Sequence, residues 1–187
     1  SLTLKALFRY TVEDGNGPAK WTLVTDTAQL TQGSRVVLAA NSKDKVAGPL
    51  SNQYLTTLDA TFSVDGTSIE ELPDDALVMT IGREDGIFTL ADADGQLLGA
   101  TAVKKLAWDG GTTSWTVEVE EGKATIANTN SSYGRFLYNG SSPRFTTYTS
   151  NTSTSMLLPQ LYILSGGSTV YYTTEIGESD KPQVPQE

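Results

Sequence analysis

The sequence predicts an all-β fold from its turn dipeptides, its strand-like alternation and its lack of helical periodicity. Seven Asp-Gly or Asn-Gly pairs punctuate the 187 residues, and such pairs tolerate the positive φ angles of tight hairpin turns. Alternating runs such as Trp115–Glu120 fit strands with one buried face. A single helical turn is expected at Ser68–Glu71, where Ser and Glu form a capping box and Pro73 prevents continuation.

A local pattern occurs three times, at 33–50, 86–100 and 122–139: a Gly, an apolar alternating strand, a polar break, a bulky apolar pair and a further strand. Each copy opens a unit of four predicted strands. The predicted strands are Arg35–Ala40, Lys45–Leu50, Thr57–Ser63, Ala76–Ile81, Ile87–Ala91, Gln96–Ala100, Lys105–Trp108, Trp115–Glu120, Lys123–Asn128, Arg135–Tyr138, Arg144–Tyr148 and Gln160–Leu164. The first unit is the longest, and a loop at Gly66–Asp75 accounts for its extra length.

Three four-stranded units, each with a Gly-punctuated first strand, resemble the β-trefoil, the fold of ricin-B-like lectins and fascins, over roughly Trp21–Ser165. The resemblance implies a β-trefoil-like barrel with extra terminal strands; a β-sandwich is the alternative. The Gln-x-Trp signature of ricin-type lectins is absent from all three units, so no particular sugar site is implied. The segments 135–139, 143–145 and 161–162 are also similar to uncharacterised modules of secreted Bacteroidetes proteins, which implies an extracytoplasmic location.

The expected organisation is a β-trefoil-like domain at 21–166 between two terminal segments. Residues 1–20 supply a strand and a loop, and residues 167–187 supply a strand and a tail that is expected to be mobile. The terminal strands are expected either to pair with each other or to cap the barrel.

Composition excludes several function classes. The formal charge of −9 disfavours nucleic acid as a partner. The chain contains no Cys and no His, which removes disulfides, the usual zinc centres and His-dependent nucleophiles, so no metal or cofactor is expected. No apolar run approaches the roughly 18 residues that a membrane span requires.

Acidic clusters have structural explanations. Asp92–Gly95 begins like a calcium loop, but Val103 stands where the bidentate Glu would fall, so a hairpin turn is expected. Asp74 and Asp75 are expected in a solvated loop. A glycosidase needs two carboxylates across a groove, and three glutamates are candidates for this role: Glu118, Glu120 and Glu121. Alternating glutamates also fit the solvent-exposed face of a strand.

The third unit supplies the best candidates for ligand binding because it combines flat rings with amide and guanidinium donors. These candidates are Tyr138, Asn139, Arg144 and Tyr148, with Phe145 beside them. The alternative is that Phe136, Leu137 and Phe145 fill the barrel and Arg144 pairs with an acid. Trp108 is a further candidate: it precedes the turn at Asp109–Gly111, and its indole either projects outward or closes the barrel.

These features predict a noncatalytic binding module of a secreted or surface protein. It would recognise a glycan or a protein surface through loops and shallow grooves between units. One alternative is a structural or accessory domain without a ligand site, and a second is a carboxylate-dependent glycosidase. No catalytic residue is assigned, and the sequence leaves the oligomeric state open.

Overall fold

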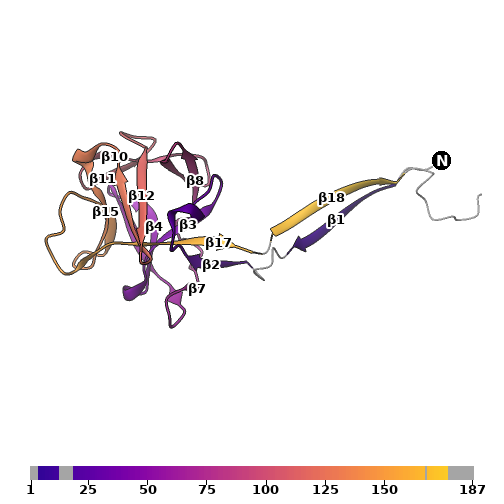
Figure 1. Ribbon diagram of the computed structural model, residues 1–187, viewed down its shortest axis with the longest axis horizontal. Coiled ribbons are helices and arrows are strands. Elements are labelled where there is room, and N and C mark those ends of the chain that lie inside the picture. Colours follow the sequence, from indigo (N-terminus) through magenta and orange to yellow (C-terminus); the bar gives the residue numbers. More distant parts are fainter. Residues whose placement is uncertain (1–3, 13–18, 167, 177–187) are drawn as a thin grey trace, which may run out of the picture. The chain divides into compact units, whose positions relative to one another are not determined.

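The computed structural model describes residues 4–12, 19–166 and 168–176, and its strands pair in antiparallel sheets (Figure 1). The strands are β1 (Leu4–Val12), β2 (Lys20–Leu23), β3 (Arg35–Ala40), β4 (Lys45–Ser51), β5 (Tyr54–Asp59), β6 (Thr61–Phe62), β7 (Ser68–Glu71), β8 (Met79–Glu84), β9 (Ile87–Ala91), β10 (Leu98–Ala102), β11 (Lys105–Trp108), β12 (Trp115–Glu120), β13 (Lys123–Asn128), β14 (Arg135–Asn139), β15 (Arg144–Tyr148), β16 (Met156–Leu157), β17 (Gln160–Ser165) and β18 (Ser168–Ile176). Among the described residues, the helical segments are three 3₁₀ turns: η1 (Thr27–Gln29), η2 (Asn41–Lys43) and η3 (Ser131–Tyr133). The all-β prediction is confirmed. Within the described ranges no helix is long and apolar enough to cross a membrane.

The chain divides into two compact units, one of residues 20–164 and one of the two terminal segments together. In the compact unit formed by the terminal segments, β1 pairs with β18 from Leu4↔Ile176 to Val12↔Ser168 (Figure 1). Of the two arrangements expected for the terminal strands, the structure shows their pairing with each other. The tail expected after Ile176 lies outside the described residues.

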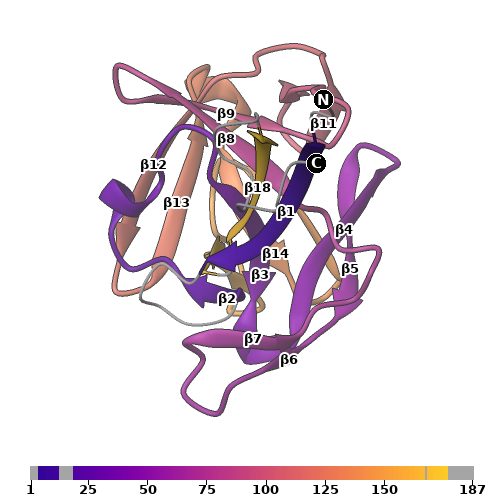
Figure 2. The ribbon, with the colours of Figure 1, turned by 90° about the vertical axis from the view of Figure 1, so that its right-hand side faces the viewer.

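Hairpins connect neighbouring strands of the larger unit, and one of their turns is formed by the Asp-Gly pair at 85–86. Asp85 and Gly86 have φ angles of 49° and 78° and join β8 to β9. Glu121 and Gly122, at 52° and 77°, join β12 to β13, which lie side by side in Figure 2. Two consecutive residues with positive φ match the right-handed twist of the flanking strands. Hairpins also join β4 to β5, β10 to β11 and β14 to β15.

Six of the twelve predicted strands match the observed bounds, and the first unit holds the largest departures. The predicted strand Thr57–Ser63 is wrong, because β5 begins at Tyr54. Asn52 and Gln53 adopt positive φ angles of 50° and 73°, so β4 turns tightly into β5 without the Gly that would have marked the turn. The predicted strand Ala76–Ile81 is shifted, because β8 runs from Met79 to the Asp85–Gly86 turn.

The helical turn predicted at Ser68–Glu71 is also wrong, because these residues form β7. Ile69 pairs with Trp21 of β2 and is 6% exposed. Burial of this one apolar side chain between two strands outweighs a capping box that Pro73 would have limited to one turn. A capping box does occur at η1, where Asp26 caps Ala28 and Gln29 caps Asp26.

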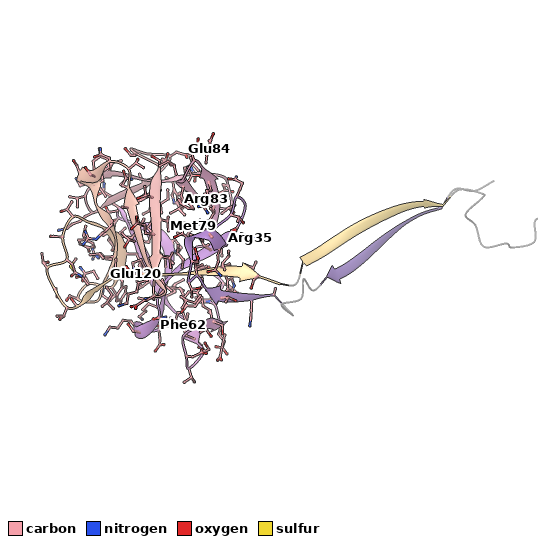
Figure 3. All side chains as sticks on the ribbon, viewed as in Figure 1. Arg35, Phe62, Met79, Arg83, Glu84 and Glu120 are labelled. Carbon is pink, nitrogen blue, oxygen red and sulfur yellow. The ribbon has the colours of Figure 1, made fainter. Side chains whose placement is uncertain are left out.

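The core contains residues from all three units and extends to both faces of some strands. On β3, Val36 and Leu38 belong to the largest buried cluster, whereas Val37 belongs to a second cluster around Tyr162. A strand buried on both faces reads as a continuous apolar run, which explains why this segment departs from simple alternation. Figure 3 shows the contrast on β8, where Met79 is 1% exposed and Glu84 extends into solvent.

The turn between β6 and β7 carries a titratable group, and we expect Asp65 to titrate at a pKa of about 2 instead of its ordinary 3.8. The Thr67 hydroxyl, the Ser63 hydroxyl and the Thr67 N–H donate to this carboxylate at 2.7, 2.8 and 3.1 Å and stabilise its charged form. Because the pKa of Asp65 is lower in the folded protein than in the unfolded chain, these hydrogen bonds stabilise the fold. Their contribution to the free energy of unfolding is complete above about pH 4 and is lost as pH falls through about 2.

Carboxyl ¹³C NMR measures the titration midpoint of Asp65. Thr67→Val should raise the pKa of Asp65, and a midpoint near 3.8 in the unaltered protein would contradict the assignment.

Candidate functional site

The β14–β15 hairpin places three of the four predicted third-unit residues on one face. Asn139 pairs with Arg144, and Tyr148 lies on β15 four residues beyond Arg144, at the same parity. Since side chains alternate along a strand, these three share a face and Tyr138 points to the opposite one. Tyr138 is 3% exposed, and its ring packs 5.3 Å from that of Phe145 in the core. Phe136, Leu137 and Phe145 are buried, as the core-packing alternative expected, and Tyr138, which was a binding candidate, is buried as well.

Beside this face lies a hollow of about 390 Å³. Asn139 and Tyr148 line it, together with the β10–β11 turn and the segment between β15 and β16. Its other lining residues are Val103, Lys104, Ser141, Thr149, Ser150, Thr152, Ser153, Ser155 and Met156. We call it the hydroxyl hollow, because six of its lining residues are Ser or Thr and none is Asp or Glu.

Tyr148 and Asn139 fix one wall of the hydroxyl hollow. Tyr148 is 6% exposed and packs with Leu137 and Met156. Its hydroxyl accepts a hydrogen bond from Asn139 Nδ2 at 3.1 Å, while Asn139 Oδ1 accepts from the Ser141 N–H at 3.0 Å. Asn139 is thus a turn former, and the ring of Tyr148 is largely covered. Both residues shape the hollow more than they offer free surface.

The hydroxyl groups form a short chain across the hollow. The Oγ atoms of Ser141 and Ser155 are 2.9 Å apart, and those of Ser153 and Ser155 are 2.8 Å apart. Either member of each pair can donate, because a hydroxyl is both a donor and an acceptor. The Gly140 N–H donates to the Ser155 carbonyl at 2.8 Å and ties the loop to the end of β14. This surface can adapt its hydrogen-bond directions to a polar ligand.

The ammonium of Lys104 is the one charged group among the residues that line the hydroxyl hollow. The backbone of Lys104 is left-handed, with φ 64°, and its N–H donates to the Thr147 carbonyl at 2.9 Å, which attaches the β10–β11 turn to β15. Its Nζ lies 5.6 Å from the centroid of the Tyr148 ring, a cation–π distance. Among the described residues the ammonium has no salt-bridge or hydrogen-bond partner.

Arg144 and Trp108 lie outside the hydroxyl hollow. The guanidinium of Arg144 stacks 4.0 Å from the centroid of the Tyr54 ring, and its Nε donates to the Ser142 carbonyl at 3.1 Å. Arg144 therefore contacts a ring, where the alternative expected an acid. Trp108 is half-buried and lines a separate hollow of about 360 Å³ with Leu50 and Leu77.

The acidic candidates occupy turns and wet strand faces. The hairpin turn expected at Asp92–Gly95 is confirmed: Asp92 Oδ1 accepts from the N–H groups of Asp94 and Gln96 at 2.9 and 2.8 Å. Glu118 and Glu120 are exposed and flank the half-buried Val119 on β12. In the part of the chain that the structure describes, no three His, Cys, Asp or Glu side chains gather as a metal site.

Lys104 and the segment Thr149–Ser155 were not among the candidates that the sequence predicted, although a charge signal marks both. None of the 22 Asp and Glu lies in 95–108 or 122–174, while five of the 13 Lys and Arg do. These two acid-free segments are the ones that line the hydroxyl hollow. The Ser- and Thr-rich run from Thr149 to Ser155 is a second signal.

Chemically, the hydroxyl hollow offers hydrogen-bond donors, hydrogen-bond acceptors and one ammonium group. A carboxylate pair for proton transfer is absent from its lining residues. The arrangement suits the binding of a polar ligand. The sequence matches no protein-family model, and a search of curated proteins finds no relative.

Proposed function

We propose that the protein is a noncatalytic glycan-binding module of a secreted or surface protein, and that the hydroxyl hollow is its binding site. The observation that carries the proposal is the lining itself, with six Ser or Thr side chains and no carboxylate. Ligand sites commonly enclose about 300–1,000 Å³, and the hollow, at about 390 Å³, falls in that range.

The chemistry of sugars supports this choice of ligand. A sugar ring presents many hydroxyls, each of which donates and accepts, so its site needs groups that do the same. The Ser141–Ser155–Ser153 chain has this property because its donor directions are interchangeable. Burial of a polar ligand is tolerated only where its groups find partners, and rotating hydroxyls can supply them without a change of backbone.

We further propose a β-trefoil arrangement for residues 20–164. Long-range pairings support it: β3 pairs with both β17 and β8, and β9 pairs with β12. The Ala124 N–H donates to the Pro159 carbonyl at 2.8 Å, next to the start of β17. With the β8–β9 and β12–β13 hairpins, these links join β3, β8, β9, β12, β13 and β17 in a ring.

The hairpins β4–β5, β10–β11 and β14–β15 contact one another, as the hydrogen bond from the Leu106 N–H to the Gln53 carbonyl at 2.9 Å illustrates. The hydroxyl hollow then lies in a groove between the second and third units.

A glycan array followed by isothermal titration calorimetry tests the proposed function. We expect saturable binding of at least one oligosaccharide by the unaltered protein. Ser150→Trp should weaken it by about tenfold or more, because the indole fills a hollow in which the Ser150 side chain is exposed and makes no hydrogen bond to the described residues.

Val64→Trp is the matched control, since Val64 is fully exposed on the β6–β7 loop and lies outside the hydroxyl hollow. Its binding should equal that of the unaltered protein. Equal loss in both variants would refute the site. Binding to no glycan, together with capture of a protein partner that Ser150→Trp abolishes, would replace the glycan with a protein surface.

A further inference from the structure

The charge around the hydroxyl hollow is opposite in sign to that of the whole chain. The formal charge is −9, yet the two segments that line the hollow carry five Lys or Arg and no acid. At physiological ionic strength, charges farther apart than about 8 Å are largely screened. Of these five cations Lys104 lines the hollow, and no Asp or Glu lines it, so Lys104 is the formal charge that a ligand in the hollow contacts.

Lys104 is the cation that the hollow presents to a ligand. Its turn is held by the hydrogen bond to Thr147, and its ammonium rests over the Tyr148 ring with three donors and no anionic partner among the described residues. The left-handed backbone of Lys104, with φ 64°, belongs to the β10–β11 turn, as the positive φ angles of Asp85 and Glu121 belong to their own hairpin turns. A positioned, unpaired ammonium beside hydroxyl donors matches an anionic group.

We propose that the hydroxyl hollow recognises an acidic glycan, and that Lys104 binds its carboxylate or sulfate group. This inference rests on the proposed function and adds the class of sugar. The hydroxyls would bind the sugar ring, and Lys104 would select glycans that carry a negative charge.

Matched pairs of oligosaccharides test the inference by calorimetry. One pair is a hexameric oligogalacturonate and its methyl ester, which removes the carboxylate charge; the other is a sulfated carrageenan oligosaccharide and its desulfated backbone. We expect the charged member of at least one pair to bind about tenfold more tightly, the size of one charge-assisted contact. The pair that shows the difference identifies the anionic group.

Three variants assign the effect to Lys104. Lys104→Gln should abolish the difference between charged and neutral members, and Lys104→Arg should retain most of it. Lys105→Gln is the control, because Lys105 is the adjacent exposed lysine and lies outside the lining of the hollow. It should leave the difference intact.

The outcomes separate this inference from the proposed function. Equal binding of charged and neutral members would overturn the acidic-glycan inference and leave a neutral-glycan module. Equal loss in Lys104→Gln and Lys105→Gln would also overturn it, because the effect would then be a general surface charge. Binding of no oligosaccharide here or on the array would overturn both.

Discussion

Trp115→Ala should lower the free energy of unfolding by about 3–5 kcal/mol, as truncation of a large buried aromatic side chain commonly does. Trp115 is 0% exposed, its ring lies 5.0 Å from that of Phe136, and its Nε1–H donates to the Leu98 carbonyl at 2.8 Å. The substitution leaves a cavity and an unpaired carbonyl together. Because a domain is stable by only about 5–15 kcal/mol, chemical denaturation followed by circular dichroism should show a strongly shifted midpoint.

Two controls divide this loss into its parts. Trp115→Phe keeps most of the ring volume and removes the donor, so it should cost less than Trp115→Ala. Ile87→Ala, at a side chain that is 38% exposed, should cost less than about 1 kcal/mol, as surface substitutions usually do. A loss below about 1 kcal/mol for Trp115→Ala would contradict the central position of Trp115 in the core.

Gly134→Ala should destabilise the third unit and disturb the hydroxyl hollow. Gly134 has φ 84° and ψ −157°, a region that only Gly adopts readily. A Cβ there would lie 2.3 Å from the Tyr148 carbonyl oxygen and 3.0 Å from the Thr149 nitrogen. Backbone atoms cannot rotate away as a side chain can, so β15 must shift. We expect a loss above about 2 kcal/mol, larger than the left-handed strain alone.

Comparison with Gly95→Ala separates the cost of a positive φ from the cost of the steric contact between the added Cβ and the Tyr148 carbonyl. Gly95 has a similar φ of +82°, but a Cβ there meets nothing within 4 Å. This variant should lose only about 1–2 kcal/mol and should bind glycan as the unaltered protein does. Denaturant unfolding measures both variants, and equal losses would show that the contact with Tyr148 is unimportant.

Most strands of residues 20–164 follow from the sequence because their signals are local. Alternation marks β12 and β13, and Asp85–Gly86 marks the hairpin between β8 and β9. The errors arise where a local signal is missing or is overruled by distant contacts. The β4–β5 turn uses Asn52 and Gln53 in left-handed conformations without Gly, and the position of β7 depends on its pairing with β2.

The candidate site was only partly predictable, for a related reason. Alternation alone would have separated Tyr138 from its neighbour Asn139, since adjacent residues of a strand face opposite sides. The approach of Lys104 to Tyr148 depends on the hydrogen bond from Lys104 to Thr147, which is 43 residues away in the chain. No local pattern encodes that contact, although the acid-free segments 95–108 and 122–174 suggest a shared surface.

The most direct test of glycan binding at the hydroxyl hollow is a ¹H–¹⁵N NMR titration of the labelled protein with neutral and acidic oligosaccharides. Binding in the hollow predicts amide shifts at Lys104 and Ser141, which line it, and along Thr149–Ser155, a segment of which five residues line it. Amides near Trp108 should stay unchanged, because Trp108 lines a different hollow. Shifts confined to the surroundings of Trp108, or no shift with any oligosaccharide, would contradict the assignment.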